Sequence, residues 1–205
     1  MRAMMQVRFS PSSPFVRKVR IAAAVLGLDK QIELVDTDTA NPSDSFVAQN
    51  PLGKIPALLL DNGSVLFDSR VILEYLDHLA GGGKILPHDI NARFEALRLQ
   101  ALCDGALDAA VLIIYESRYR PAEMRVESWV DRQRGKIGRA LAALEKAPPT
   151  HGAIPTVGEI ALACLLGYGD FRFAGHWRKE HPALVAWLDR FAAQVPAFEA
   201  TMPSG

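Results

Sequence analysis

The sequence predicts a chain in two parts: a small α/β unit arranged βαβ-ββα, followed by an all-helical unit. Three observations carry this prediction. Up to about residue 80, strand-like and helix-like patterns alternate. The run Gly81-Gly-Gly83 then interrupts these patterns, as a linker does, and beyond it nothing resembles a strand. We therefore expect an α/β domain over residues 1–80, a linker over 81–90 and a helical domain over 91–205.

The first unit contains strand, helix and turn signals in a clear order. Met5–Phe9 has the pattern of a strand, and a helix is expected from Pro14 to Leu26, where Gly27 ends it. Asn62-Gly63 signals a hairpin turn, because Asn and Gly tolerate positive φ. The other expected elements are a strand at 31–35, one or two helical turns at 42–49, strands at 55–60 and 64–67, and a helix that opens at Asp68 and Ser69.

The second unit shows helical spacing only. A long helix is expected over residues 91–118, and Pro121 fits the first turn of the next helix, which runs to about residue 147. Two further helices are expected at 156–171 and 182–193. Before the first of these, Thr156 and Glu159 have the spacing of a capping box, which stabilises a helix N-terminus by about 1 kcal/mol.

Composition argues against several classes of function. The 23 Lys plus Arg balance 23 Asp plus Glu, so no net charge attracts nucleic acid or an anionic membrane. No apolar run is long enough to span a membrane, and the opening segment is too short for a signal peptide. Cys103 and Cys164 lie in apolar helix patterns at no metal or disulfide spacing. We therefore expect two buried thiols in a reducing compartment, and a cytoplasmic protein.

The segment Asn50-Pro-Leu-Gly-Lys-Ile-Pro56 precedes an apolar stretch. A proline at the start of a strand cannot donate to the ladder, which leaves two interpretations open. A trans proline simply begins an edge strand. A cis proline turns the backbone of Ile55 outward, so that its N–H and C=O can pair with an extended, peptide-like ligand.

Two serines stand where helices are expected to begin. Ser13 precedes Pro14, the pattern of an N-cap followed by a proline at the first helical position, and Asp68-Ser69 opens the third helix. Either serine can be a plain structural cap. Alternatively, the positive end of the helix dipole lets a hydroxyl at Ser13 stabilise a thiolate. It also lets Ser69 hold a ligand carboxylate while Asp68 pairs with an ammonium.

Taken in order, Ser13-Pro-Phe15, Asn50-Pro-Leu-Gly-Lys-Ile-Pro56 and Asp68-Ser69 resemble the glutathione S-transferase family. The resemblance spans essentially the whole chain. It implies a thioredoxin-like N-terminal domain, glutathione as co-substrate, a small electrophile as second substrate, and a homodimer. It also implies a set of glutathione-binding roles: Ile55 before a cis Pro56 pairs with the cysteinyl backbone, Asp68 and Ser69 hold the γ-glutamyl end, Lys54 reaches the glycyl carboxylate, and Phe15 belongs to the same site.

The resemblance makes Ser13 the catalytic residue that holds the sulfur. Ser12 is the alternative, because the register beside two prolines is loose. A serine here, rather than a cysteine, favours activation of glutathione as a nucleophile over thiol exchange.

Asp104 and Asp108 lie one helical turn apart and share a face. No histidine accompanies them at ligand spacing, so we expect no metal site. The resemblance instead lets such an acid approach the glutathione amine. It also implies a second-substrate pocket that these acids share with aromatic and basic residues: Tyr115, Arg118, Tyr119, Tyr168 and Arg172. The alternative is an ordinary polar face and a Tyr/Arg packing network.

The function expected from these residues is that of a glutathione S-transferase, which activates the glutathione thiol for attack on a small electrophile. Two alternatives remain. One is an isomerase similar to the zeta members, in which glutathione adds to a cis double bond and leaves after rotation. The other is a non-catalytic binding or regulatory module that uses the same fold.

Overall fold

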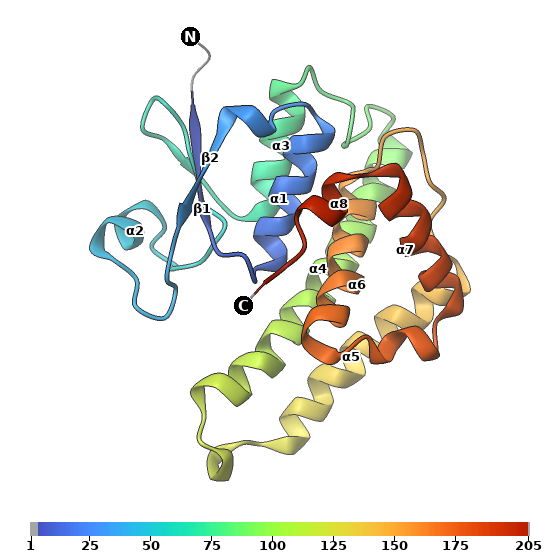
Figure 1. Ribbon diagram of the computed structural model, residues 1–205. Helices are drawn as coiled ribbons and strands as arrows, with labels where there is room; N and C mark the ends of the chain where they lie inside the picture. The colour runs from blue at the N-terminus through green and yellow to red at the C-terminus, as the bar shows by residue number, and fades with distance from the viewer. Residues whose placement is uncertain (1–3, 205) are drawn as a thin grey trace.

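The fold is described for residues 4–204 in a computed structural model (Figure 1). A mixed sheet with its helices forms one part of the molecule, and a bundle of helices forms the other. The strands are β1 (Met5–Phe9), β2 (Ile32–Asp36), β3 (Leu58–Leu59) and β4 (Val65–Leu66). The helices are α1 (Pro14–Val25), α2 (Asp44–Gln49), α3 (Ser69–Leu79), α4 (Ile90–Tyr119), α5 (Glu127–Lys146), α6 (Val157–Phe173), α7 (Pro182–Gln194) and α8 (Ala197–Ala200). Within the described residues, 3-10 helices lie at Asp29–Gln31, Ala122–Met124 and His176–Lys179.

The sheet has the order β2-β1-β3-β4. β1 runs parallel to β2, with Met5 opposite Ile32, and antiparallel to β3, with Val7 opposite Leu58. β3 and β4 form the predicted hairpin, although each strand is shorter than expected. The turn between them places Gly63 at φ +84°, a conformation that residues with a Cβ rarely adopt.

Helices cover both faces of the sheet. Successive side chains of a strand point to opposite faces, so Val7 and Arg8 face different layers. Val7 is buried in the core to which α1 and α3 contribute. On the other face, Arg8 Nε donates to Gln49 Oε1 of α2 at 2.7 Å, and the guanidinium lies over the Phe46 ring. Figure 1 shows α2 on the side of the sheet away from α1 and α3.

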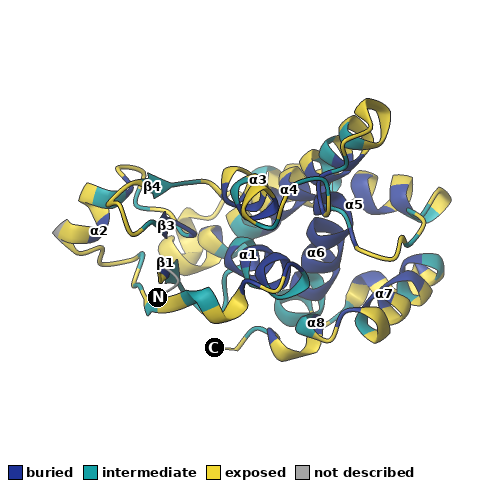
Figure 2. Cartoon of the chain, turned by 90° about the horizontal axis from the view of Figure 1, so that it is seen from above, coloured by how far each residue is buried: buried dark blue, intermediate teal, exposed yellow. Residues whose placement is uncertain are grey.

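α6 is the central helix of the helical part. It is buried from Val157 to Tyr168, and Figure 2 shows it enclosed by its neighbours. The predicted capping box begins it: the Glu159 N–H donates to Thr156 Oγ1 at 3.3 Å, and the Thr156 N–H donates to Glu159 Oε2 at 2.8 Å. These two bonds use donors that the first turn of a helix otherwise leaves unpaired.

α1 packs against both parts of the molecule. It contacts α3 on one side and α6 and α8 on the other. Arg17 of α1 is 5% exposed and donates from Nη2 to the Phe198 C=O at 2.7 Å and from Nε to Thr201 Oγ1 at 3.3 Å. Gly167 of α6 leaves room for it, because a Cβ there would lie 2.3 Å from Arg17 Nη1. Arg17 therefore fastens the C-terminal segment to α1.

The segment that follows α3, expected to be a linker, is closely bonded to that helix. The Asp77 carboxylate accepts three backbone N–H groups, those of Gly83 at 2.8 Å, Lys84 at 3.0 Å and Ile85 at 2.8 Å. Ile85 is fully buried, and its C=O accepts the Val157 N–H at 2.8 Å. This connection is therefore packed against the start of α6 and bonded to it.

The predicted helix start at Pro121 is wrong, because Pro121 lies in the loop between α4 and α5. Hydrogen bonds that involve side chains hold this loop against the end of α4. The Val126 N–H donates to Glu116 Oε1 at 3.1 Å, and Arg125 Nη2 donates to the Ser117 C=O at 2.8 Å. The loop thus satisfies polar groups at a helix end, and α5 begins only after it.

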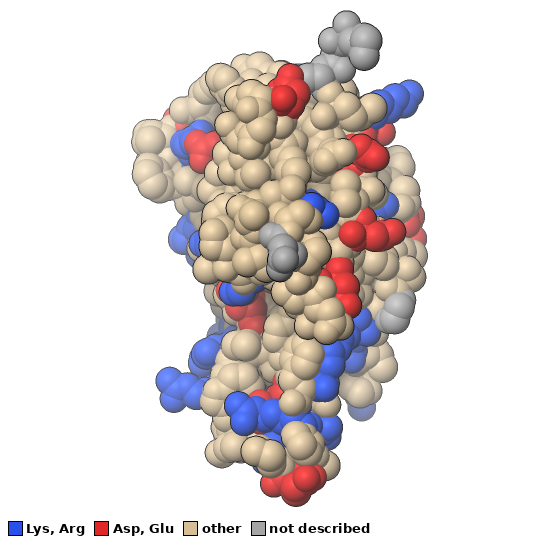
Figure 3. Space-filling model, turned by 90° about the vertical axis from the view of Figure 1, so that its left-hand side faces the viewer, with Lys and Arg blue, Asp and Glu red and all other residues tan. Residues whose placement is uncertain are grey.

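Acidic and basic side chains are interspersed over the surface in Figure 3, with Lys and Arg more frequent in its lower half, over the ends of α4 and α5. Among residues 4–204, no helix is long and apolar enough to cross a membrane. In the same range, no group of three or more His, Cys, Asp and Glu is arranged to hold a metal ion. Cys103 and Cys164 are buried as predicted, and burial raises the pKa of the Cys164 thiol to about 11.

Candidate functional site

Ser13 is the N-cap of α1. Its backbone is extended (φ −80°, ψ 118°), and its Oγ accepts the Val16 N–H at 3.3 Å. The nearby Ser10 Oγ and Ser12 Oγ lie 3.3 Å apart and bond to each other. A hydroxyl that accepts one bond keeps its own proton for another partner. Ser13 therefore presents a hydroxyl donor at the positive end of α1.

The segment before β3 presents open backbone. The Ile55–Pro56 peptide is cis, which decides between the two interpretations of this motif. Asn50, 1% exposed, shapes the loop before it: Nδ2 donates to the Lys54 C=O at 2.6 Å, and Oδ1 accepts the Leu52 N–H at 3.1 Å. Among residues 4–204, neither the N–H nor the C=O of Ile55 has a hydrogen-bond partner. Both groups are available to an extended ligand.

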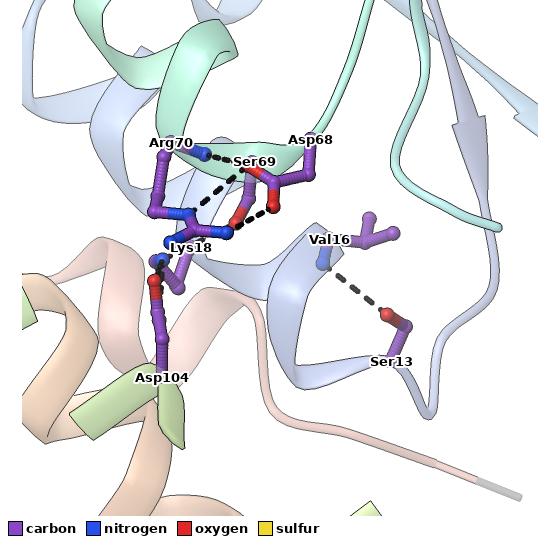
Figure 4. A network of polar contacts seen from close by, with 7 residues as sticks. All are labelled: Ser13, Val16, Lys18, Asp68, Ser69, Arg70 and Asp104. Carbon is purple, nitrogen blue, oxygen red and sulfur yellow. Dashed lines mark hydrogen bonds and ion pairs between the residues drawn. The ribbon is translucent and has the colours of Figure 1, made fainter. Parts of the chain in front are cut away.

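Asp68 and Ser69 begin α3, as expected. The Asp68 carboxylate caps the helix by accepting the Arg70 N–H at 3.0 Å, and it also accepts Arg70 Nη2 at 2.8 Å. Burial opposes ionisation of Asp68, but the hydrogen bonds and charge of Arg70 outweigh it and lower the pKa of the carboxyl. Ser69 is 2% exposed, and its Oγ accepts Lys18 Nζ at 3.2 Å (Figure 4).

Lys18 is a polar residue that the sequence patterns did not single out. It is fully buried in α1, and its Nζ donates to Asp104 Oδ1 at 2.6 Å and Oδ2 at 2.8 Å, as well as to Ser69 (Figure 4). Burial raises the pKa of Asp104, and the Lys18 charge opposes this change. The overlooked signal is position: Lys18 lies one turn before Ile21 and Ala22, on the buried face of α1.

A hollow of about 610 Å³ lies between these elements and the helical part. One wall comes from the α/β part and includes Ser13, Phe15, Lys54 and Ile55. The opposite wall comes from α4 and α6, with these residues: Asp108, Val111, Leu112, Ile114, Tyr115, Arg118, Tyr119, Tyr168 and Arg172.

A second, smaller hollow of about 210 Å³ adjoins the first. Its lining includes Pro56, Asp68 and Ser69 from the α/β part and Asp104 and Asp108 from α4. The two hollows share four lining residues: Phe15, Lys54, Ile55 and Asp108. The two hollows therefore adjoin beside the open backbone of Ile55.

The far wall of the larger hollow is aromatic and basic. The Tyr115 and Tyr119 rings meet edge to face at 5.2 Å between centroids. Burial raises the pKa of Tyr168, against the hydrogen bond and charge of Arg172. Arg118 is exposed beside them. The predicted pocket residues on α4 and α6 therefore lie together, with the exception of Asp104, which lines only the smaller hollow.

Comparison with known families matches both parts of the chain. The family model for the glutathione S-transferase N-terminal domain matches residues 12–79, and the model for the C-terminal domain matches residues 127–190. The chain belongs to the glutathione S-transferase family. It is 33% identical to the uncharacterized GST-like protein YibF of Escherichia coli, over 95% of this chain and 96% of that protein. It is also 31% identical to the maleylacetoacetate isomerase of Pseudomonas aeruginosa, over 91% of this chain and 90% of that enzyme.

Solved structures of glutathione S-transferases share the whole fold. A family member from Pseudomonas fluorescens, crystallised with glutathione, is 42% identical and superimposes with a TM-score of 0.91, over 98% of this chain and 100% of that one. The glutathione complex of an enzyme from Methylobacillus flagellatus is 33% identical, with a TM-score of 0.87 over the same shares. The thioredoxin-like half and the helical half thus have the arrangement of this family.

In this member of the family, the residues predicted to bind glutathione divide between the two hollows. Ser13, the leading candidate for the sulfur, lines the larger hollow, whereas Pro56, Asp68 and Ser69 line the smaller one. Ile55 lies on both. The runner-up, Ser12, lines the larger hollow as well, but its hydroxyl is bonded to Ser10.

Proposed function

We propose that this member of the glutathione S-transferase family binds glutathione along the two adjoining hollows and uses the Ser13 hydroxyl to activate its thiol for attack on a small electrophile. The observation that carries the proposal is the position of the Ser13 hydroxyl: it lines the larger hollow, and its Oγ accepts the Val16 N–H at 3.3 Å, so its own proton can be donated to a ligand. Glutathione complexes of structural neighbours that are 42% and 33% identical support the ligand.

Each part of glutathione meets a group of matching chemistry in this pose. The cysteinyl backbone pairs with the unpartnered N–H and C=O of Ile55. The γ-glutamyl carboxylate and ammonium lie at Ser69 and Asp68, where the hydroxyl donates and the ionised carboxylate accepts. The exposed Lys54 meets the glycyl carboxylate. The sulfur then lies at Ser13, facing the α4 and α6 wall.

Chemistry at the sulfur follows from this placement. The thiol gives its proton to solvent, and the Ser13 O–H donates to the resulting thiolate, which lowers the pKa of the bound thiol. The thiolate attacks an electrophilic carbon in the larger hollow. A C–S bond forms while the bond to a leaving group breaks, or while the π electrons of an activated double bond move to its activating group and solvent supplies the proton.

Replacement of Ser13 tests the mechanism. We expect Ser13→Ala to bind glutathione within a few-fold of the wild-type Kd, because the backbone and γ-glutamyl contacts remain. Its kcat/KM with a reactive electrophile should fall about 100-fold, since a donor to the developing negative charge is lost. Calorimetry and a panel of electrophiles measure the two quantities. Ser12→Ala is the matched control and should stay near wild type; a fully active Ser13→Ala would contradict the mechanism.

A glutathione-dependent isomerase is the second candidate, and a specific similarity favours it. The chain is 31% identical to a maleylacetoacetate isomerase over 91% of its length. An isomerase returns glutathione unchanged, so the thiol concentration stays constant while a cis double bond becomes trans. A solved neighbour contains S-(propanoic acid)-glutathione, so unsaturated carboxylic acids belong in the electrophile panel. Binding without any turnover would instead favour a non-catalytic module.

We also propose that the protein is a cytoplasmic homodimer. Two buried free thiols fit a reducing compartment. Apolar side chains are exposed on adjoining faces of α3 and α4, where Arg93 Nη2 and Glu74 Oε1 lie 2.6 Å apart: Val71 is 46% exposed, Ile90 59% and Phe94 62%. Exposed apolar residues gathered on one face are typical of a subunit interface.

A further inference from the structure

A buried lysine, Lys18, donates a hydrogen bond to Ser69, the residue proposed to bind the γ-glutamyl carboxylate of glutathione. Lys18 has three N–H donors and no acceptor. Its contacts use all three: Asp104 Oδ1 at 2.6 Å, Asp104 Oδ2 at 2.8 Å and Ser69 Oγ at 3.2 Å. Figure 4 shows Lys18 between the start of α3 and the side of α4. All three side chains are at least nine-tenths buried, so the geometry is enclosed by protein.

The bond from Lys18 decides what the Ser69 hydroxyl can do. A lysine can only donate, so the Ser69 oxygen must accept, and its proton points elsewhere. The Ser69 hydroxyl has no second partner among residues 4–204, although Ser69 is 2% exposed and lines the smaller hollow. A buried hydroxyl of this kind favours a ligand oxygen that accepts. The start of α3, which is positive, favours the same kind of ligand.

The charged side chains around Ser69 form pairs of opposite charge. Lys18 is balanced by Asp104, and Arg70 by Asp68. Asp108 is a further acid that lines the same hollow, and the charges of Lys54 and Arg70 lower the pKa of its carboxyl against the effect of burial. A zwitterion, with a carboxylate at Ser69 and an ammonium near the acids, matches this alternation. A net anion or a net cation does not.

We propose that Lys18 is a positioning residue for the γ-glutamyl carboxylate of glutathione. It holds the Ser69 oxygen from behind, so that the hydroxyl proton is presented to the ligand, and Asp104 of α4 holds Lys18 in place. Affinity for one end of glutathione, in the α/β half, thus depends on a carboxylate from the helical half. This inference rests on the proposed function.

A double-mutant cycle tests whether Lys18 acts through Ser69. Lys18→Met keeps the length of the side chain and removes the donors. We expect Lys18→Met and Ser69→Ala each to raise the Kd for glutathione about 10-fold, the usual scale for a hydrogen bond to a charged group. The two changes together should be no worse than the larger single change. Effects that multiply would overturn the proposal, because the residues would then act independently.

Lys54→Met is the matched control for a lost lysine. It also removes a positive charge from the lining of the two hollows, but at the glycyl end of the proposed pose. Its effect on the Kd should multiply with that of Ser69→Ala. If Lys54→Met and Lys18→Met gave the same coupling to Ser69→Ala, the loss of charge alone would explain both results, and the positioning role would be wrong.

A second variant guards against a merely structural effect. Lys18→Met leaves the Asp104 carboxylate buried without its partner, which destabilises a fold. Lys18→Met with Asp104→Leu replaces the ion pair by apolar side chains, and its thermal unfolding temperature should return toward wild type. We expect this stable variant still to bind glutathione weakly. A wild-type Kd in the folded double variant would contradict the proposal.

A comparison of two ligands distinguishes a specific effect on the γ-glutamyl group from a general disturbance of the binding site. Cysteinylglycine lacks the γ-glutamyl group, so its Kd should be the same in wild type and in the Lys18→Met/Asp104→Leu variant. With an electrophile, the KM for glutathione should rise while kcat at saturating glutathione is retained. Equal weakening of both ligands would mark a structural role and overturn the inference. If the wild-type chain does not bind glutathione at all, the proposed function fails first, and this inference fails with it.

Discussion

Asp108 is the acid that lines both hollows, and its protonation can be tested through the pH dependence of glutathione binding. The residue as a whole is exposed, but partial desolvation of its carboxyl raises the pKa of that group, while the charges of Lys54 and Arg70 oppose the rise. An Asp whose pKa is raised becomes protonated at a higher pH than an ordinary one. Only the ionised form attracts the ammonium of a bound γ-glutamyl group.

The affinity for glutathione should therefore weaken as the pH falls through the raised pKa of Asp108. We expect Asp108→Asn to bind a few-fold more weakly at neutral pH and to lose this part of the pH dependence, as measured by calorimetry. Asp38→Asn is the control: Asp38 lines the larger hollow, but a backbone hydrogen bond from Ala40 lowers its pKa, so it stays ionised. An Asp108→Asn profile that follows the wild type would contradict the assignment.

The residues of the candidate site differ in how well they could be predicted from the sequence. Ser13 and Asp68-Ser69 stand at helix starts, where local patterns single out hydroxyl and acidic caps, and the structure has these caps. Lys18 belongs to no such motif; its position on the buried face of α1 is a weak signal, because a lysine on an amphipathic helix is normally solvated. Its burial depends on Asp104, a residue of α4 that only folding brings near.

At the scale of elements, α6 shows how a local motif fixes a buried helix. Thr156→Ala removes the oxygen that accepts the Glu159 N–H and the hydroxyl that bonds to Glu159 Oε2. We expect a loss of about 1 kcal/mol in the free energy of unfolding, measured by urea denaturation. Thr156→Ser keeps the oxygen and should lose much less. Equal stability of the Ala variant and wild type would show that the cap is dispensable.

The element boundaries that failed depend on contacts outside the local pattern. Pro121 is compatible with the first turn of a helix, but bonds from Glu116 and Arg125 hold the following residues in a loop. The hairpin strands are short because only Leu58–Leu59 and Val65–Leu66 meet as a ladder. The periodicity of apolar side chains indicates that an element exists, whereas hydrogen-bond and packing partners elsewhere in the chain determine at which residue it ends.

At the scale of the whole molecule, the exposed face of α3 and α4 predicts a dimer. We expect the wild type to have the mass of two chains by light scattering at micromolar concentration. Phe94→Glu puts a charge at a proposed interface and should shift the mass to one chain, because burying an unpaired charge is costly. Met124→Glu, at the tip between α4 and α5 and 59% exposed, is the control and should remain a dimer. A monomeric wild type would contradict the proposal.

The sequence by itself determined the class of fold, the order of nearly all the elements and the residues that carry the family's motif. These follow from local rules: side-chain periodicity, turn residues and helix caps, each of which acts over a few neighbours. The cis form of the Ile55–Pro56 peptide lay beyond those rules, since the motif allowed both isomers. Only the tertiary structure decided this point and three others: that the Ile55 backbone remains unpaired, that Lys18 turns inward to Asp104, and that two hollows adjoin beside Ile55. The physical reason is the same for all of them. Each depends on groups far apart in the chain, whose burial and pairing are settled only when α4 and α6 pack against α1.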